Sequence, residues 1–573
     1  MGRVQQRPNW QVSSRSFVSS SIHTAPFSKM QEPYSKPDHS DVHGDDTSHQ
    51  RRGRISHFRL LVDSAGVTNQ VLNFSYPGDG TVASPYIVDF LDDDQHNPLL
   101  LPRWKRYTCT FLVAFATLAV TFISSAYSGV VADINAEFGI SANLSILGVS
   151  VYVLGFAIGP FLWAPLSEQF GRRLPFLGSY IALTAFNGGS VAANSFATLA
   201  ILRFFAGAFG SSCLTNAGAT IADMFDANER GRMLAIFLAA PLLGPSLGPI
   251  VGSYLGEAAG WRWVHGFFAL FTGTITILNL VFVPETYAPI LLSKRAAKLS
   301  SIKGKVYVAR TSLGQKKKLG EQFKITFSRP WALLFREPIV LLISIVMSII
   351  YGILYMLFPL VPFIFESQHN WSPETSELAF LGVTVGMLIG VFHSIYNNKY
   401  YVLLAIKHGG IPPPEVRLKI ALPASVIFPA GLFLFAWTNG AGIHWIVPII
   451  AMAIFSYGLV VIFLSLTNYL IDTYVVFAAS VFAGNTVLRS IFGAVFPLFT
   501  TPLLHNLGIH WASSIPAFLG IFCLPFPLFF YLYGSRIRRK GKYATQAAEI
   551  LQQLLEKTPR PPNNRSEMTI AVE

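Results

Sequence analysis

Twelve runs of mainly apolar residues, each long enough to cross a lipid bilayer as a helix, occupy most of the sequence between residues 107 and 533. At about 1.5 Å per residue, a helix needs about 20 residues to cross a hydrocarbon layer of roughly 30 Å. Because unpaired backbone groups are not tolerated in lipid, such runs have to be helical. We therefore expect an all-α integral membrane protein with spans near residues 107–131, 143–164, 174–194, 200–222, 233–255, 263–284, 339–364, 375–396, 416–437, 444–466, 478–503 and 511–533.

The composition fits a membrane protein and disfavours other classes. Hydrophobic residues make up 52% of the 573 residues and charged residues 13%, whereas soluble domains carry roughly 25% charge. The net charge is +13, but the basic residues lie in separate hydrophilic segments, so we expect no nucleic-acid partner. Cys109, Cys213 and Cys523 lie inside apolar runs, where an isolated cysteine acts as a small hydrophobic residue. We expect no disulfide framework and no metal site.

A hydrophilic stretch between the sixth and seventh runs sets the predicted orientation. Residues 285–338 carry twelve Lys or Arg against three acids, and the positive-inside rule places such a segment in the cytoplasm. With an even number of spans, both termini then also lie in the cytoplasm. Two positions deviate from the rule, since Arg262 is predicted outside and the turn near Asp472 is predicted inside without a basic residue.

The runs divide the chain into five parts. We expect residues 1–105 to be a disordered cytoplasmic tail, because their polar composition cannot bury enough apolar area to offset the entropy of ordering. Two six-helix bundles follow over 106–284 and 339–534, and the basic cytoplasmic loop 285–338 joins them. Residues 535–573 are expected to form a cytoplasmic C-terminal tail.

The second run ends in charge, in the stretch GPFLWAPLSEQFGRR over residues 159–173. Glu168 lies one turn before Arg172, and Gly171 permits a tight turn. In one interpretation, Arg172 and Arg173 only anchor the chain at the inner surface. We favour a salt-bridged latch that opens and closes as helices rock. Its candidate residues are Glu168, Gly171, Arg172, Arg173, Asp223, Glu229 and Arg230.

This stretch resembles the loop motif of the major facilitator superfamily, in the form carried by fungal twelve-helix drug/proton antiporters. The usual motif, Gly-x-Leu-Ala-Asp-Arg-x-Gly-Arg-Arg, is changed here at Ala164, Glu168 and Gln169. The segment from Asn468 to Phe499 is similar to the same antiporters. The resemblance covers about residues 107–535 and implies the major facilitator fold, with two pseudo-symmetric six-helix bundles and a substrate site near the middle of the membrane.

Glycines recur every four residues in the fifth and eighth runs. The fifth run contains Gly244, Pro245, Gly248, Pro249 and Gly252, and the eighth contains Gly382, Gly386 and Gly390. Each set of glycines lies on one helix face, where a neighbouring backbone can approach closely, and generic packing is the alternative. We expect the two glycine faces to meet as a hinge or seal between the halves. The first set also resembles the antiporter signature on the superfamily's fifth helix, with Ser253 replacing the last glycine.

Two arginines lie inside predicted spans. Arg203, with Gly207 four residues later, resembles a fourth-helix motif of the superfamily whose arginine is implicated in proton transfer. An intramembrane arginine costs at least about 2.5 kcal/mol and usually faces a cavity or a partner, although one near a helix end can snorkel to the surface. Arg489 is the second candidate for proton coupling. The titrating carboxylate has no clear candidate, because acids such as Glu366 map near outer helix ends.

Aromatic residues on the seventh run are candidates for the substrate cavity. Tyr351 and Tyr355 recur at helical spacing, and Asn485 of the eleventh run joins them as a polar candidate. A cavity with such walls would suit bulky, partly apolar or cationic compounds. Packing or lipid contact is the alternative for each aromatic residue.

These features and the resemblance together predict a proton-coupled exporter of drugs, toxins, polyamines or secondary metabolites that works by alternating access. No phosphate-binding loop is present, so we expect a proton gradient and no cofactor to drive it. The expected partners are a small-molecule substrate, protons and the lipid bilayer, and the expected unit is a monomer in the plasma membrane, with the vacuolar membrane second. The alternatives are an uptake or facilitative transporter of a small nutrient and a membrane sensor that does not transport. We expect no enzyme, because no nucleophile elbow, carboxylate pair or His-rich pattern occurs.

Overall fold

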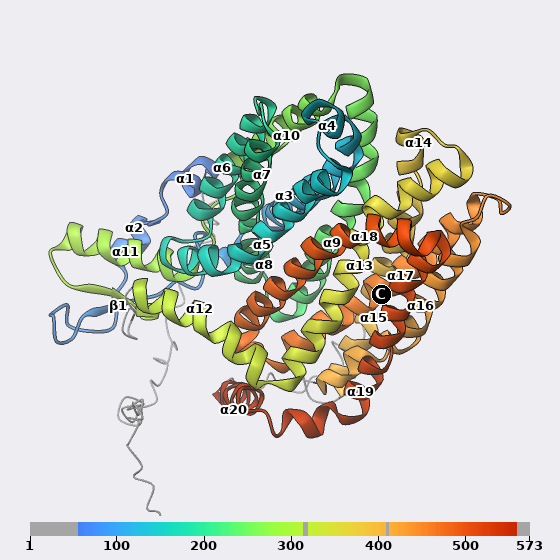
Figure 1. Ribbon diagram of the computed structural model, residues 1–573. Helices are drawn as coiled ribbons and strands as arrows, with labels where there is room; N and C mark the ends of the chain where they lie inside the picture. The colour runs from blue at the N-terminus through green and yellow to red at the C-terminus, as the bar shows by residue number, and fades with distance from the viewer. Residues whose placement is uncertain (1–55, 313–318, 408–411, 558–573) are drawn as a thin grey trace, which may run out of the picture. The chain divides into compact units, whose positions relative to one another are not determined.

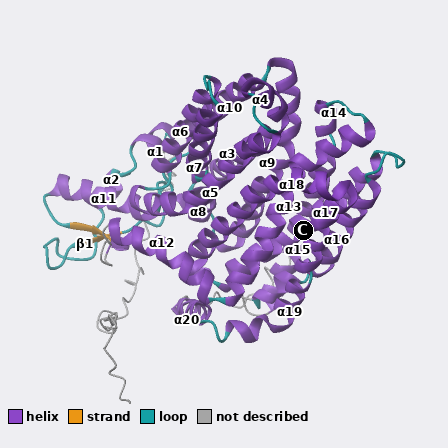
Figure 2. Cartoon of the chain, viewed as in Figure 1, coloured by secondary structure: helices purple, strands orange, loops and turns teal. Residues whose placement is uncertain are grey.

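The computed structural model describes residues 56–312, 319–407 and 412–557, and nearly all of its regular structure is helical (Figures 1 and 2). The N-terminal half contains α3 (Arg103–Ala126), α4 (Val131–Phe138), α5 (Ala142–Phe170), α6 (Arg173–Val191), α7 (Phe196–Gly210), α8 (Ser212–Met224), α9 (Ala227–Ala259) and α10 (Trp261–Phe282). The C-terminal half contains α13 (Pro338–His369), α14 (Pro373–Glu377), α15 (Phe380–Lys407), α16 (Ala421–Thr438), α17 (Ile446–Thr473), α18 (Ala478–Cys523) and α19 (Pro525–Arg538).

Ten helical segments of the described chain are long and apolar enough to cross a membrane. The third predicted span corresponds to α6, whose small and polar residues, including Asn187, lower its hydropathy, and it is not among the ten. The last segment, Ala478–Arg538, covers both the eleventh and twelfth predicted spans, and Gly508 breaks it with a φ of 73°. The predicted helical membrane fold is confirmed, and the number of twelve crossings stays a prediction.

Helices of each half pack mainly within that half. In the N-terminal half α3 lies against α9, α5 against α7 and α6 against α10, and in the C-terminal half α13 lies against α18 and α16 against α17. The helix pairs with the most extensive contact across the boundary are α5 with α18 and α9 with α15. The 3₁₀ turns η3 (Tyr127–Val130) and η5 (Pro414–Leu418) precede α4 and α16.

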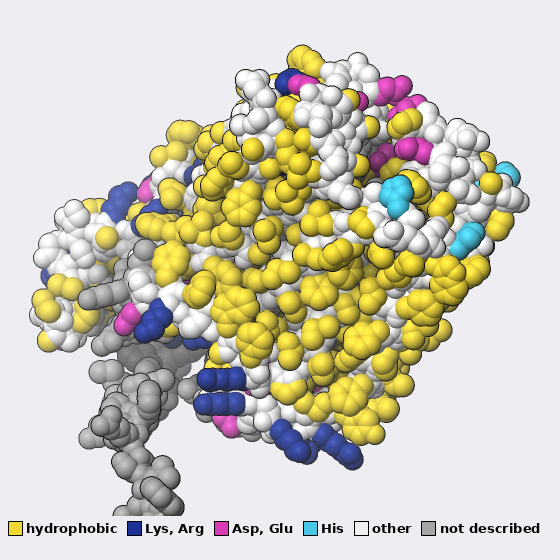
Figure 3. All heavy atoms as spheres, viewed as in Figure 1, with side chains coloured by type: hydrophobic (Ala, Val, Ile, Leu, Met, Phe, Trp, Pro, Cys, Tyr) yellow, Lys and Arg dark blue, Asp and Glu magenta, His cyan; other side chains and the backbone are white. Residues whose placement is uncertain are grey.

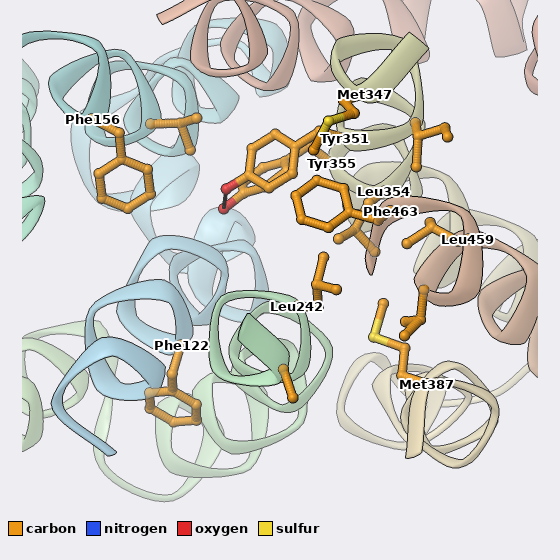
Figure 4. Close-up of a cluster of buried hydrophobic side chains, with 14 of the residues drawn as sticks. Phe122, Phe156, Leu242, Met347, Tyr351, Leu354, Tyr355, Met387, Leu459 and Phe463 are labelled. Atoms are coloured by element: carbon orange, nitrogen blue, oxygen red, sulfur yellow. Dashed lines mark hydrogen bonds between the residues drawn. The ribbon is translucent and has the colours of Figure 1, made fainter. Parts of the chain in front are cut away.

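Tyr351 and Tyr355 of α13 lie in a hydrophobic cluster to which both halves contribute. Ser124 Oγ of α3 and Tyr355 Oη of α13 are 2.7 Å apart, and Tyr351 Oη donates to Tyr355 Oη at 3.3 Å. Figure 4 shows the two rings side by side among apolar residues from both halves, including Phe122, Leu242 and Phe463. Thr384 of α15 also donates a hydrogen bond to Ser246 of α9, at 3.0 Å.

Charged groups mark the two ends of the helices. We call one the basic end, which carries Arg103, Arg172, Arg417 and Arg538, and the other the acidic end, which carries Asp133, Glu137, Glu366 and Glu374. On the face in Figure 3, acidic side chains gather at the upper end. Arg262, the basic residue that is predicted to lie outside, is at the acidic end. It donates a hydrogen bond to Glu137 at 2.6 Å and stacks on Trp261.

Part of the predicted disordered tail is folded. Its segments α1 (His57–Val62), α2 (Asn69–Asn73) and β1 (Tyr86–Val88) lie against α11 (Ala288–Lys303) and β2 (Tyr307–Ala309), and β1 pairs with β2 in parallel. The prediction of disorder is therefore wrong for residues 56–101, while residues 1–55 lie outside the described residues.

The reason is that the apolar partners of the tail lie some 200 residues away. Val71 and Val88 are buried against Leu292 and Leu299 of the central loop, and a buried ion pair joins Asp94 to Arg295. We call residues 56–101 and 288–310 the tail–loop module.

Candidate functional site

The charged motif is a tight corner between α5 and α6 at the basic end. Gly171 has a φ of 93°, and a Cβ there would overlap the carboxylate of Glu285. That carboxylate accepts hydrogen bonds from the backbone nitrogens of Arg172 and Arg173, at 2.9 and 3.2 Å. These are orphan donors of the first turn of α6, where the helix dipole also favours an anion. Glu285 thus fixes the start of α6.

Arg172 forms the ion pair of the motif. Its Nε donates to Asp223 Oδ2 of α8 at 3.0 Å, and its guanidinium lies 4.4 Å from the centre of the Tyr287 ring. Burial raises the pKa of the Tyr287 phenol, and the charge of Arg172 only partly opposes this. The ion pair ties α6 to α8, both in the N-terminal half.

The structure brings together only part of the predicted latch. Glu168 and Arg230 are exposed and make no ion pair within the described part of the chain, and Glu229 pairs instead with Arg106 at 3.2 Å. These three were wrongly grouped with Arg172, because helix phase alone does not fix which way a residue at a helix end points. Glu285 was missed, and its only sequence signal was its position as the first acid after the sixth span.

Arg173 connects the corner to the folded part of the tail. Its two Nη atoms donate to the carbonyl oxygens of Leu61 in α1, at 2.5 Å, and Leu280 in α10, at 2.8 Å. It therefore does not belong to the ion pair of Arg172.

A matching cluster lies at the basic end of the C-terminal half. Arg417 Nε donates to Asp472 Oδ2 at 2.8 Å, and its Nη1 donates to Asn398 Oδ1 at 2.8 Å. Tyr401 Oη donates to the same Asp472 oxygen at 2.8 Å. Asp472, which has no basic neighbour in the sequence, is therefore paired, and each half has an arginine–aspartate pair at this end.

Arg203 is buried in the N-terminal half, with 1% of its surface exposed. Its Nε donates to the carbonyl of Gly148 at 2.7 Å and its Nη2 to that of Ser124 at 3.3 Å, while the rings of Tyr127 and Tyr152 flank the guanidinium. No described carboxylate pairs with it. The snorkelling alternative is wrong, because every contact is inside the helical bundle.

Gly207 and Arg489, the other candidates for proton coupling, have different surroundings. A Cβ at Gly207 would overlap the carbonyl oxygen of Tyr152, so this glycine lets α7 approach α5. The guanidinium of Arg489 lies 4.8 Å from the centre of the Tyr351 ring and 5.5 Å from that of Phe463, and its Nε has no hydrogen-bond partner in the described chain. Arg203 in the N-terminal half and Arg489 in the C-terminal half thus both lie beside aromatic rings.

The two glycine ladders do not face each other. Cβ atoms at Gly244, Gly248 and Gly252 would overlap α3, and those at Gly382, Gly386 and Gly390 would crowd α17. The predicted contact between the fifth and eighth spans exists, as the packing of α9 on α15, but its glycine-to-glycine form is wrong. The glycine faces of α9 and α15 allow close packing on α3 and α17, within their own halves. At the boundary between the halves, α9 and α15 meet through Ser246 and Thr384.

The proposed cavity residues are buried in the seam between the halves. Tyr351, Tyr355 and Asn485 are 3%, 0% and 1% exposed, and Asn485 Nδ2 donates to Ser344 Oγ at 3.3 Å. In this conformation the two tyrosines pack within the cluster of Figure 4, so the packing alternative holds for both.

A cavity of about 260 Å³ lies between the halves at the acidic end. The N-terminal half contributes Ser128, Asn135 and Ser253, and the C-terminal half contributes Phe358, Phe363, Glu366 and Glu377 among others. At the basic end, a cavity that both halves line has about 90 Å³, and it includes Gly231, Tyr401 and Arg417. Of these two cavities, the one at the acidic end is the larger. Within the described residues no group of three His, Cys, Asp or Glu could hold a metal ion.

Comparisons with known proteins agree with this architecture. The sequence model of the Major Facilitator Superfamily matches residues 113–497. The chain is 54% identical to the MFS-type efflux pump MFS2 of Trichophyton rubrum over 504 residues, which cover 88% of this chain and 85% of that protein. It is also 54% identical to the major facilitator superfamily multidrug transporter mdrA of Aspergillus fumigatus over 517 residues, covering 90% and 85%. The solved structure of the proton:xylose symporter XylE, bound to 6-bromo-6-deoxy-D-glucose, matches with a TM-score of 0.54 and 18% identity over 75% of this chain and 96% of that one.

Proposed function

The chain belongs to the major facilitator superfamily, and from that premise we propose that it exports small molecules in exchange for protons. It is a transporter of a family that binds small-molecule substrates within a membrane. The proposed cargo is a drug, toxin, polyamine or secondary metabolite, and the chain works as a monomer in the plasma membrane, with both termini in the cytoplasm.

The observation that carries alternating access is the unequal space between the halves. The cavity at the acidic end holds about 260 Å³ and that at the basic end about 90 Å³, and residues of both halves line each of them. Rocking of the halves, in which contacts between them such as that of Ser124 with Tyr355 break and form again, would exchange the two openings. In the predicted orientation, this conformation is the more open one toward the outside.

Proton coupling draws support from Arg203. A cation held by carbonyl dipoles and aromatic faces, with no described carboxylate, biases the charge and water of its surroundings without titrating itself. The sequence has no nucleotide-binding loop, so we assign the driving force to the proton gradient and assign no cofactor.

Export is favoured over uptake by the names of relatives, an efflux pump and a multidrug transporter that are each 54% identical. The test compares accumulation of a fluorescent drug in fungal cells that lack or overexpress the chain. Export predicts lower internal dye on overexpression, and a protonophore abolishes the difference. Higher internal dye would indicate uptake, and no change across a panel of dyes would favour a sensor.

A further inference from the structure

The cavity at the acidic end contains a buried carboxylate that sequence reasoning did not identify. Glu377, the last residue of α14, is 3% exposed, and its Oε2 has no hydrogen-bond partner among the described residues. No described Lys, Arg or His pairs with it. An ionised carboxylate in such a position is costly unless a cation compensates it.

The place of Glu377 in the fold makes it part of the boundary between the halves. The short helix α14 packs against α13 of its own half and against α9 and η3 of the other. From α13, Glu366 also lines the cavity, and it accepts a hydrogen bond from Ser376 at 3.3 Å. The cavity residues from α9 and η3 are the uncharged Ser253, Ser128 and Gly129. Two carboxylates therefore share this cavity, and none of its lining residues is basic.

The remaining walls are apolar and partly aromatic. Phe358 and Phe363 come from α13, while Ile146 and Val149 come from α5 of the other half. A proton could neutralise Glu377, but the cavity of about 260 Å³ also has room for a small organic molecule. A carboxylate beside aromatic faces is the arrangement that binds an organic cation through charge and cation–π contact.

We propose that this cavity binds a monovalent organic cation, with Glu377 as its main counter-charge, Glu366 as a second acid and Phe363 as an aromatic wall. This inference rests on the proposed export function in one respect. If the chain exports, this cavity is the last site that the substrate occupies before its release to the outside. Binding itself does not depend on transport.

The test measures binding of radiolabelled choline to the purified full-length chain by equilibrium dialysis. Its neutral isostere, 3,3-dimethylbutan-1-ol, serves as competitor, since it has the same shape without the charge. We expect choline to bind, the isostere to compete at least about tenfold less well, and Glu377→Gln to weaken choline binding at least about tenfold. Glu374→Gln is the matched control, because it removes an acid one turn earlier on the same short helix without lining the cavity.

A second variant tests the inference independently if Glu377→Gln does not fold. Phe363→Leu keeps an apolar wall but removes the aromatic face, and we expect it to weaken choline about threefold or more while leaving the isostere unaffected. The inference is wrong if wild-type protein does not bind choline, if the isostere competes equally well, or if a folded Glu377→Gln variant keeps full affinity. If the wild-type chain binds choline but its overexpression does not lower internal dye, only the proposed function is contradicted.

Discussion

Arg203 is held by backbone carbonyls and tyrosine rings, so the shape of its side chain matters as much as its charge. Lysine keeps the charge but lacks the planar fork that reaches both Gly148 and Ser124 and stacks between Tyr127 and Tyr152. We expect Arg203→Lys to reduce proton-driven efflux at least about tenfold while the protein still inserts in the membrane. Uptake of a fluorescent drug into inverted vesicles with an acidic lumen measures this, because the lumen corresponds to the outside of the cell. Arg230→Lys, at an exposed position, is the control, and equal losses in both variants would contradict a special role for Arg203.

Glu285 stabilises the corner after α5 through backbone groups rather than through an arginine side chain. Glutamine at this position keeps the size but lacks the negative charge of the carboxylate, which accepts hydrogen bonds from the first backbone amides of α6. Hydrogen bonds to charged groups contribute about 1.5–3 kcal/mol, and we expect Glu285→Gln to lower the stability of the N-terminal half by that order. The thermal midpoint of the purified protein reports the change. The exposed Glu168→Gln should leave the midpoint unchanged, and a similar drop there would refute the assignment.

Helices were predictable from the sequence, but the faces they turn to their neighbours were not. Each predicted span overlaps described helix, because a long apolar segment in lipid has to pair its backbone groups within itself. The glycine spacing at 244, 248 and 252 correctly predicts a close approach, yet it does not name the neighbour, which is α3 rather than α15. Likewise, nothing in the sequence marks Glu377 as buried, because acids at helix ends are usually solvated. The packing of α14 against its neighbours buries this side chain.

The contact of α9 with α3 leads to a prediction about a single added methyl group. A Cβ at Gly248 would overlap Ser125 Oγ and the carbonyl oxygen of Phe122, so the helices have to separate. We expect Gly248→Ala to destabilise the protein by about 1–3 kcal/mol, and Gly248→Leu to block transport while membrane insertion is kept. Gly178→Ala on α6 meets open space and should be neutral or slightly stabilising. Normal efflux by Gly248→Leu would remove the close-packing argument.

The tail–loop module joins parts of the chain that the sequence presents as separate. Burial acts to raise the pKa of Asp94, but hydrogen bonds from His96 and Arg295 hold it well below its usual range. Because the folded-state pKa is the lower one, Asp94 stabilises the module above about pH 4, and this contribution is lost as the pH falls toward the folded-state pKa. We expect Asp94→Asn to cost about 3–5 kcal/mol at neutral pH, since it leaves Arg295 buried without a counter-charge.

Hydrogen exchange of the amides in β1 measures this effect. Wild-type protection should be constant from about pH 8 to about pH 5, apart from the intrinsic exchange rate, and Asp94→Asn should lose protection throughout. Asp89→Asn is the control, because Asp89 pairs with Arg310 where both side chains are largely exposed. Equal protection in the Asp94→Asn variant would show that the parallel strands hold the tail without the buried ion pair.

The contact between Ser124 and Tyr355, where the two halves meet, influences the relative populations of the conformations of the whole molecule. Tyr355→Phe removes the hydrogen bond to Ser124, whose hydroxyl keeps the carbonyl of Thr121 as acceptor. It also removes the acceptor of the buried Tyr351 hydroxyl, which should lower folding stability by about 1–3 kcal/mol, but that bond joins two residues of α13 and does not link the halves. One neutral hydrogen bond contributes about 0.5–1.5 kcal/mol, which changes an equilibrium about threefold to tenfold. If this bond belongs to the conformation with the larger opening at the acidic end, its loss lowers the population of that conformation.

A cysteine placed at Ala132, an exposed residue of the cavity, should then react more slowly with a membrane-impermeant maleimide. The three native cysteines are buried and contribute little background. An unchanged labelling rate would mean that the bond persists in both conformations and that the seam acts as a pivot.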